Sequence, residues 1–384
     1  MRVAIIYQYI YPQNFGGGEK RLYEIFSRFP KNIEIDWFVQ YQENYDSFYE
    51  LKRFSITAFE KNKKNDVRRS ILEIFRYCYF LLTRVDLRKY DIIHIGQMPF
   101  FHILALQLKS KIMNLFYKKT AYISIDWWEF WGNYWLTKHG KYFGVIGAIV
   151  ERMILFLATH LIVISPKTYK DVNGKTRARL ELIHNGVDFK KINAVVSIEK
   201  KYDFIILGRL EEWKNPMMGV QVFQKMLEQD SSLKLLIVGD GSYAKFLNDY
   251  IMSNNIQKNV FMHGKAADEQ IFSLLKNAKM MLLFSKQEGG GSITLFEANA
   301  CGLPVATASF ENGIDREIVT IKNGFFFTEH DHNFIASELL KVLKSDDLLH
   351  ELSETSKDFV KNFDWSILSK QYFDFFENIL KERQ

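Results

Sequence analysis

The sequence predicts an α/β protein made of two doubly wound, Rossmann-like parallel-sheet domains that face each other across a cleft. Three observations support this fold class. The 384 residues suit two domains of ordinary size. Short apolar segments recur at helix-length spacing, which is typical of parallel strands joined by crossover helices. Several of these segments run directly into glycine-rich turns, where such sheets bind ligands.

The first half supplies one such series. Arg2–Gln8 is an apolar strand that leads to three glycines, Gly16–Gly18, and then to an amphipathic helix over Glu19–Arg28. The polar stretch 41–69 predicts a loop, and Ser70–Thr83 predicts a helix with aromatic residues on one side. Further predicted strands are Ile33–Gln40, Asp91–Ile95, Ala121–Ile125, Leu161–Ile164 and a last strand that begins at Leu182.

The second half repeats the pattern after a polar linker at 190–201. Its predicted strands are Tyr202–Leu207, Leu233–Val238, Val260–His263, Met280–Phe284, Pro304–Ala308 and Gly324–Phe327. We therefore expect one domain over residues 1–195 and a second over 196–364, followed by an amphipathic helix at Trp365–Lys381.

Composition limits where the protein works. Two cysteines, Cys78 and Cys301, give no disulfide framework and fit a reducing cytosol. The opening apolar run is too short for a signal peptide, and Phe143–Ile164 is interrupted by Glu151, Arg152 and His160. We expect a cytoplasmic protein, peripheral at the inner face of the cell membrane.

Charge is divided unevenly along the chain. Residues 1–197 carry 30 lysines and arginines against 18 acidic residues, a charge of +12, whereas residues 198–384 carry 21 against 27, a charge of −6. A basic first half favours contact with a membrane surface or a lipid-phosphate acceptor. A lysine-rich surface without such a partner explains the charge equally well. We expect no nucleic-acid partner.

Two segments of the second half carry the strongest chemical signal. Gly208-Arg209 follows a buried strand and Lys214 comes five residues later, so two cations can face one anion. Downstream, Glu288 precedes a glycine loop, Gly289–Gly291, and the start of a helix. We expect Ser292 to cap this helix, the N–H groups of Ile293 and Thr294 to face a diphosphate, and Glu297 to reach a ribose.

Other strand ends give weaker signals. Gly17 and Gly18 let backbone approach a ligand closely, although a surface turn explains them as well. Gly241 lies in a glycine turn, and His263-Gly264 offers backbone to a nucleobase edge. The aromatic stretch after Ile125 holds Asp126, Trp128 and Glu129, and aromatic rings beside carboxylates are suited to sugars. The alternative for this stretch is a hydrophobic staple at the domain's edge.

Taken together, these segments resemble family 4 of the retaining glycosyltransferases, which have the two-domain GT-B fold. The resemblance covers nearly the whole chain. It rests on Gly17-Gly18, His184–Asp188, Gly208-Arg209, Lys214, Glu297-Ala298, Ala300–Val305 and Asn323–Phe325.

The resemblance implies roles for particular residues. Arg209 and Lys214 hold the donor diphosphate, Glu297 binds the ribose, Glu288 contacts the donor sugar, and the first glycine loop closes over the phosphates. It also implies that residues 365–384 pack back on the first domain, that Gly208, Gly290 and Gly291 line the donor site, and that no metal or other cofactor is required.

Two departures from the family pattern are visible. The family's two glutamates are usually eight positions apart, but Glu288 and Glu297 are nine apart, and eight back from Glu297 is Gly289. Either the loop carries one extra residue, or Glu288 has lost its usual place. Many relatives also have a histidine in the loop after the Tyr122–Ile125 strand, near the place of Trp128, and in our interpretation Asp126 or Glu129 takes over some of its contacts.

The sequence therefore predicts a retaining hexosyltransferase of cell-surface glycan or glycolipid synthesis. It moves a hexose from a nucleotide-diphosphate sugar to a hydroxyl of a glycan or lipid-linked acceptor. Asp126 and Glu288 are candidate catalytic residues with Arg209 and Lys214, and Asp126, Trp128 and Glu129 are candidates for binding the acceptor. Two alternatives remain open: a nucleotide-sugar epimerase of the same fold, and a non-catalytic subunit that binds nucleotide-sugar.

Overall fold

The computed structural model describes residues 1–13, 16–41, 53–60, 71–117, 120–196 and 199–382. The chain divides into two compact units, Met1–His184 with Trp365–Gln384, and Asn185–Asp364. The predicted boundary at residue 195 therefore falls too late. The short helix α6 (Phe189–Ala194) belongs to the second unit, because Ile192 is buried in that unit's core and the Val187 amide donates to the Phe363 carbonyl.

The first unit is built on a parallel sheet, in which the described residues form seven strands. In spatial order the strands are β3 (Ser55–Glu60), β2 (Glu34–Tyr41), β1 (Arg2–Ile6), β4 (Ile92–Gly96), β5 (Tyr122–Trp127), β6 (His160–Val163) and β7 (Arg179–Leu182). The chain leaves β1 toward β2 on one side and later returns to β4 on the other. The order of strands thus reverses between β1 and β4, which is where a doubly wound sheet opens a crevice.

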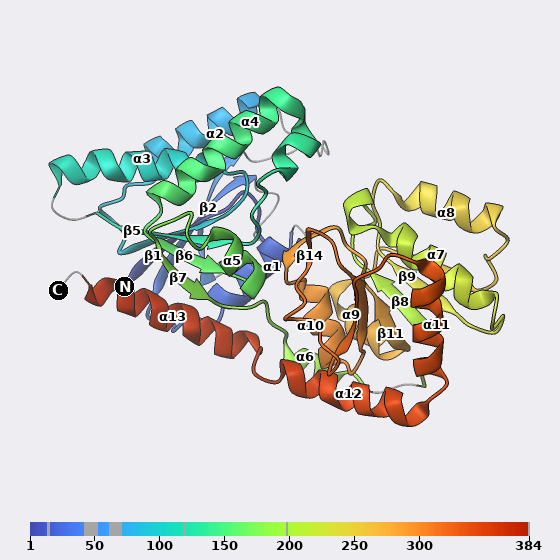
Figure 1. Ribbon diagram of the computed structural model, residues 1–384. Coiled ribbons are helices and arrows are strands. Elements are labelled where there is room, and N and C mark those ends of the chain that lie inside the picture. Colours follow the sequence, from blue (N-terminus) through green and yellow to red (C-terminus); the bar gives the residue numbers. More distant parts are fainter. Residues whose placement is uncertain (14–15, 42–52, 61–70, 118–119, 197–198, 383–384) are drawn as a thin grey trace. The chain divides into compact units, whose positions relative to one another are not determined.

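Helices cover both faces of this sheet. They are α1 (Gly17–Phe26), α2 (Ile71–Arg84), α3 (Phe101–Phe116), α4 (Tyr134–Leu157), α5 (Pro166–Val172) and α13 (Trp365–Lys381). Figure 1 shows α2, α3 and α4 on one side of the sheet and α13 on the other. Helix α13 packs against α1, where the Phe26 and Phe376 rings lie 6.1 Å apart. The C-terminal helix is therefore part of the first unit, as its apolar face requires.

The second unit repeats the architecture with a six-stranded parallel sheet among the described residues. Its strands, in spatial order, are β10 (Val260–Gly264), β9 (Leu235–Val238), β8 (Tyr202–Leu207), β11 (Ala278–Leu282), β13 (Val305–Ala308) and β15 (Gly324–Phe327). Besides α6, its helices are α7 (Pro216–Leu227), α8 (Ala244–Ser253), α9 (Asp268–Lys276), α10 (Ile293–Ala300), α11 (His332–Leu343) and α12 (Asp346–Val360). The order of strands reverses between β8 and β11.

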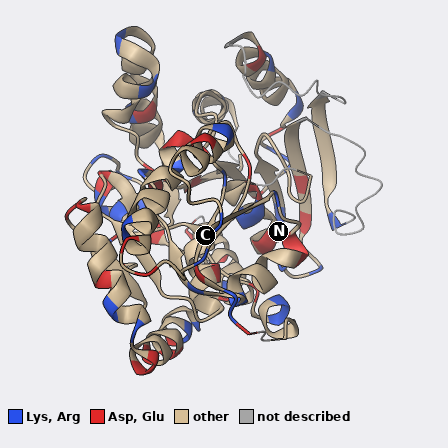
Figure 2. Ribbon diagram, turned by 90° about the vertical axis from the view of Figure 1, so that its right-hand side faces the viewer, with Lys and Arg blue, Asp and Glu red and all other residues tan. Residues whose placement is uncertain are grey.

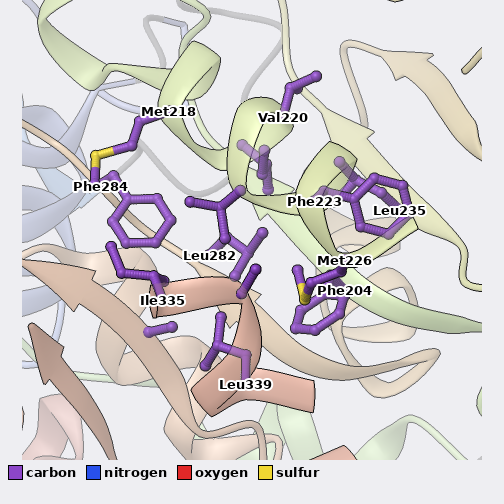
Figure 3. Close-up of a cluster of buried hydrophobic side chains, with 14 of the residues drawn as sticks. Phe204, Met218, Val220, Phe223, Met226, Leu235, Leu282, Phe284, Ile335 and Leu339 are labelled. Carbon is purple, nitrogen blue, oxygen red and sulfur yellow. The ribbon is translucent and has the colours of Figure 1, made fainter. Parts of the chain in front are cut away.

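The core of the second unit lies between this sheet and its helices. Phe204, Phe223, Leu282 and Leu339 are buried together there, from β8, α7, β11 and α11 (Figure 3). Outside the core, lysines and arginines alternate with aspartates and glutamates on several helices (Figure 2), and some pair at one-turn spacing, as Lys341 does with Glu338. Exposed pairs of this kind contribute little to stability.

The last strand of the first unit, predicted to begin at Leu182, instead ends there as β7 (Arg179–Leu182). Two other differences are short strands that were not predicted. Residues 53–60 of the predicted 41–69 loop include β3, and residues 42–52 and 61–69 of that segment lie outside the described residues. The second difference is a small parallel sheet of β12 (Gln287–Gly290) and β14 (Asn312–Ile314). The strands of the small sheet are polar and glycine-rich and lack the apolar pattern that identifies a buried strand, and β3 has only Ile56, Ala58 and Phe59 as apolar residues.

Candidate functional site

The site in the second unit begins at the switch point of its sheet. After β8, Gly208 has a φ of 145°, and the chain then makes the single 3-10 turn η3 (Glu212–Lys214). Asn215 follows in the left-handed conformation, with a φ of 51°, and Pro216 starts α7. A hollow at this point is lined by Gly208, Arg209 and Lys214 and, from the loop after β11, by Ser285. The loops after β8 and β11 thus meet where the fold places ligands.

Both predicted cations lie against one indole ring. The Arg209 guanidinium carbon is 5.0 Å from the centre of the Trp213 ring, and the Lys214 ammonium nitrogen is 4.7 Å from it. Cation–π contact of this kind attracts a positive charge without neutralising it. Trp213 therefore positions two cations beside one another, a role that the sequence analysis missed although the residue stands next to Lys214.

Lys214 also forms an ion pair with Glu288, and both side chains are largely buried. The pair joins the loop after β8 to β12, so it connects the two segments that the sequence analysis singled out. Burial of two charges is costly unless they are paired. The pair therefore holds the Lys214 ammonium group in the site, beside Trp213.

The glycine loop is held in place by its own small sheet. Gly289 and Gly290 have φ angles of 57° and 89°, which glycine adopts without strain. The Gly290 carbonyl accepts from the Asp315 amide at 2.9 Å, and the Gly291 carbonyl accepts from the Asn185 side chain at 2.6 Å. This loop is consequently an ordered element that leads into α10. Asn185, which the sequence analysis used only as part of the His184–Asp188 motif, is a further positioning residue.

Helix α10 starts where predicted, but its cap differs from the prediction. Ser292 occupies the N-cap position, yet its hydroxyl bonds the Thr294 hydroxyl at 2.9 Å and makes no bond to a backbone amide. The first amides of a helix, those of Ile293 and Thr294 here, have no partner within the helix. The partial positive charge at the N-terminus of α10 is thus not compensated by the Ser292 side chain. Glu297 lies one turn further on and is only 4% exposed.

The weaker predictions for this unit have structural explanations. Gly241 has a φ of 159°, and a Cβ atom there would come within 2.4 Å of the Leu210 carbonyl oxygen, so glycine lets the loop after β9 pack on the loop after β8. His263 and Gly264 end the edge strand β10, where the Gly264 carbonyl accepts from the Gly239 amide at 2.9 Å. Neither His263 nor Gly264 is among the residues that line the hollow in the described chain.

Asp126, predicted as catalytic and acceptor-binding, is buried inside β5. Its Oδ2 accepts from Arg21 Nε at 3.0 Å and its Oδ1 accepts from the Tyr372 hydroxyl at 2.7 Å. Arg21 further donates to the carbonyls of Ile183 and His184. The carboxylate thus joins α1, β5 and α13, and its buried bonds give Asp126 a structural role within the first unit in place of an exposed position beside a ligand. The strand runs two residues further than predicted, which turns Asp126 inward.

Trp128 and the first glycine loop lie together at the switch point of the first unit. A Cβ atom on Gly18 would come within 2.3 Å of the Trp128 ring, and the Tyr7 ring lies edge-on to that ring at 5.3 Å. The Gln97 side chain accepts from the amides of Trp128 and Glu129 at 2.8 and 3.0 Å. Gln97, which no sequence pattern indicated, therefore fixes the loop after β5 from the loop after β4.

Glu129 and the tryptophans after it form a structured turn. The Glu129 carboxylate accepts from Trp131 Nε1 at 2.6 Å. The buried Glu151 carboxylate accepts from the amides of Trp131 and Gly132 and from Trp135 Nε1, at 2.8 to 3.2 Å. Burial is the largest influence on Glu151 and raises its pKa to about 7. Trp135 is buried, so the alternative interpretation of this aromatic stretch, a hydrophobic staple at the domain's edge, accounts for Trp135.

The described part of the chain contains neither a membrane-spanning helix nor a cluster of metal-binding side chains. No helix there has both the length and the apolar content needed to cross a bilayer. The same residues contain no group of three or more His, Cys, Asp or Glu side chains placed to hold a metal ion.

Two Rossmann-like units, one with cations and a helix N-terminus at its switch point, form an architecture in which anionic ligands bind beyond the strand ends. Comparison with known proteins makes the class specific. The model of the glycosyl transferases group 1 matches residues 188–359, and that of glycosyltransferase family 4 matches residues 15–191. The two matches together span nearly the whole chain, and the protein belongs to this family of glycosyltransferases with the GT-B fold.

Individual relatives are distant in sequence. An uncharacterized glycosyltransferase of Methanocaldococcus jannaschii is 23% identical over 314 residues, covering 78% of this chain and 71% of the relative. A Campylobacter jejuni α-1,4-N-acetyl-D-galactosaminyltransferase acting on an undecaprenol-linked glycan is 23% identical, covering 94% of both chains. HepE of Anabaena, solved in complex with UDP, has a TM-score of 0.75 at 16% identity and covers 98% of this chain and all of its own. At that identity the structural likeness establishes the fold.

Proposed function

We propose that the protein transfers a hexose from a nucleotide-diphosphate sugar to a hydroxyl of a glycan or lipid-linked acceptor, with retention of anomeric configuration and without a metal. The observation that carries the proposal is the Lys214–Glu288 pair beside Arg209 at the switch point of the second unit. The distantly related HepE, which binds UDP, and the Campylobacter relative, whose name specifies an undecaprenol-linked glycan, support the choice of donor and acceptor.

In this proposal the donor diphosphate takes over the ion pair. A diphosphate carries more negative charge than a carboxylate and accepts from Arg209, Lys214 and the amides of Ile293 and Thr294 at once. Glu288 is then released from Lys214 and stands beside the sugar. Its contact with Lys214 supports the view that the glycine loop carries one extra residue, with Glu288 keeping the place of the first glutamate.

The chemical step breaks the bond between the anomeric carbon and the diphosphate oxygen and forms a bond to the acceptor oxygen on the same face of the sugar. The acceptor's proton passes to the departing phosphate oxygen, so no enzymatic nucleophile is required. Arg209, Lys214 and the start of α10 stabilise the negative charge that develops on the leaving group. Glu297, one turn into α10, accepts from the ribose hydroxyls.

The acceptor half of the proposal rests on the first unit. With Asp126 assigned to the buried network, Trp128 and Glu129 remain as candidates for contact with the acceptor sugar, and both are partly exposed. Trp128 also contacts Gly18, so the first glycine loop and the Trp128 ring form one surface. An aromatic ring beside a carboxylate suits the apolar face and the hydroxyl groups of a sugar.

A thermal-shift screen of the full chain against UDP, GDP, ADP and their common sugars tests the donor. A ligand at one hundred times its dissociation constant stabilises the fold by about 2.7 kcal/mol, enough to raise the melting temperature by several degrees. Arg209→Ala with Lys214→Ala removes two charge-assisted bonds and should weaken binding by at least about a hundredfold, abolishing transfer while the fold is kept.

The matched control is Lys225→Ala with Lys341→Ala, which removes two exposed lysines from helices of the same unit. This variant should bind the nucleotide as the unaltered chain does. The proposal is refuted if no nucleotide shifts the melting temperature, or if the Arg209 and Lys214 variant binds and transfers as well as the control.

A further inference from the structure

We infer that the first unit docks on an anionic lipid bilayer through the outward faces of α2, α3 and α4, lying on the membrane surface without crossing it. The inference does not rest on the proposed donor or reaction. It is based on the side chains that the fold leaves exposed. It also assigns the excess positive charge of the first half of the sequence to one surface.

Each of the three helices is apolar on two sides. On α4, Gly144, Val150 and Ile154 are buried toward the unit's core, while Ile146 and Ile149 lie exposed between them in sequence. The same outward spacing of three and four residues recurs on α2 and α3. The exposed apolar residues are Leu72, Phe75, Tyr79 and Leu82 on α2, Leu108, Ile112, Leu115 and Phe116 on α3, and Leu136, Tyr142, Phe143, Val145, Ile146, Ile149, Met153 and Phe156 on α4.

The three stripes face the same way. Helix α3 contacts both α2 and α4, and all three lie on one side of the sheet (Figure 1). Sixteen of the twenty-seven exposed large hydrophobic side chains in the described residues belong to these three helices. The second unit exposes such residues singly, as with Ile321, which is the normal condition of a protein surface. A concentration on neighbouring helices marks an interaction surface.

The charges on these helices select the partner. Their exposed charged residues are all basic: Arg76, Arg84, Lys111, Lys138, Lys141 and Arg152. The three helices carry two acidic residues, Glu73, which is half-buried, and Glu151, which is buried. Apolar and aromatic side chains beside lysine and arginine are typical of helices that lie in the headgroup region of anionic bilayers. A second copy of the chain would oppose the same positive charges, which disfavours self-association.

Helix α4 is also shaped for lying on a surface. Gly140 is non-helical, with a φ of 74°, so the element turns between Tyr134–His139 and the longer segment that follows. Tyr142, just after this turn, is 84% exposed, and Phe156 near the other end is 71% exposed. Aromatic side chains at both ends of an exposed stripe suit the interface between water and lipid.

Vesicle co-sedimentation of the full chain tests the inference, with phosphatidylcholine vesicles compared to vesicles that also contain phosphatidylglycerol. Binding should be strong on the mixed vesicles and fall as salt is raised. The variant Ile146→Gln, Ile149→Gln, Phe156→Gln should bind them at least about tenfold more weakly, since these side chains would otherwise enter the bilayer interface. Its control is Phe246→Gln, Met252→Gln, Ile321→Gln, which alters three exposed apolar residues of the second unit.

A second variant keeps the apolar stripe and changes charge: Lys111→Gln, Lys141→Gln, Arg152→Gln. It should lose about fivefold in affinity per residue for the mixed vesicles, and the loss should vanish at high salt. Thermal shift with UDP reports separately on the second unit, so a failure of donor binding and a failure of membrane binding are distinguishable. The inference is overturned if the unaltered chain does not bind mixed vesicles, if the α4 variant binds like its control, or if that variant instead converts a dimer to a monomer.

Discussion

Replacing Asp126 with asparagine separates a structural from a catalytic role for this carboxylate. Its two oxygens accept from Arg21 Nε at 3.0 Å and from the Tyr372 hydroxyl at 2.7 Å, and the side chains of all three residues are buried. An asparagine has one acceptor oxygen and one donor group in that place. One of the two donors would therefore face an N–H group, and the Arg21 guanidinium would remain buried without its counter-charge.

The cost follows from the burial. Removing one partner of a buried ion pair typically destabilises a protein by 3–5 kcal/mol, because the remaining charge is left uncompensated. Proteins are stable by only about 5–15 kcal/mol, so Asp126→Asn should leave the first unit marginally folded. With a urea dependence of about 2 kcal/mol per molar, the unfolding midpoint should fall by roughly 2 M.

Urea unfolding followed by circular dichroism measures this shift, and Asp171→Asn is the matched control. Asp171 pairs with Lys167 at 2.5 Å near the surface, so the same substitution there should cost at most about 1 kcal/mol. The reasoning fails if Asp126→Asn unfolds at the unaltered midpoint, and a stable variant without transfer activity would restore Asp126 as a catalytic residue.

Two further predictions concern the first unit. The raised pKa of Glu151, about 7 against 4.5 in the unfolded chain, means that the folded state binds more protons between these values, so stability should decline as pH rises from about 4.5 to 7. Glu151→Gln should flatten that decline in urea midpoints measured across the range, and an unchanged slope would contradict the assignment. Gly18→Ala would bring a Cβ atom to 2.3 Å from the Trp128 ring and should lower the melting temperature by several degrees. The double variant with Trp128→Ala should recover part of that loss relative to Trp128→Ala alone, and additive losses would show that the two residues do not interact.

Particular residues show where sequence reasoning succeeded. The strand at Tyr202–Leu207 was predicted with its observed bounds, because a run of six mostly apolar residues between polar ends has few other interpretations. The glycine positions after it were also informative. Gly208 has a φ of 145°, a backbone conformation that residues other than glycine rarely adopt. Local patterns of this kind can be read from the sequence alone, because they depend on neighbouring residues.

Other residues could not be placed from sequence. Asp126 follows a predicted strand end and so looked available to a ligand, but the strand continues and the side chain meets Arg21, 105 positions earlier in the chain, and Tyr372, 246 positions later. Gln97 carried no motif, yet its amide holds the backbone of Trp128. Such partnerships depend on which helices and loops are brought together by the folded sheet.

The sequence by itself determined the two parallel sheets, the family of the chain and the positions of its cations and glycine loop, since apolar periodicity and turn residues act over a few neighbours. Only the tertiary structure decided that Lys214 pairs with Glu288, that Asp126 is buried, and that α2, α3 and α4 present their apolar stripes on one side. Contacts between residues distant along the chain form only when strands from different segments align, and that alignment is a property of the whole domain.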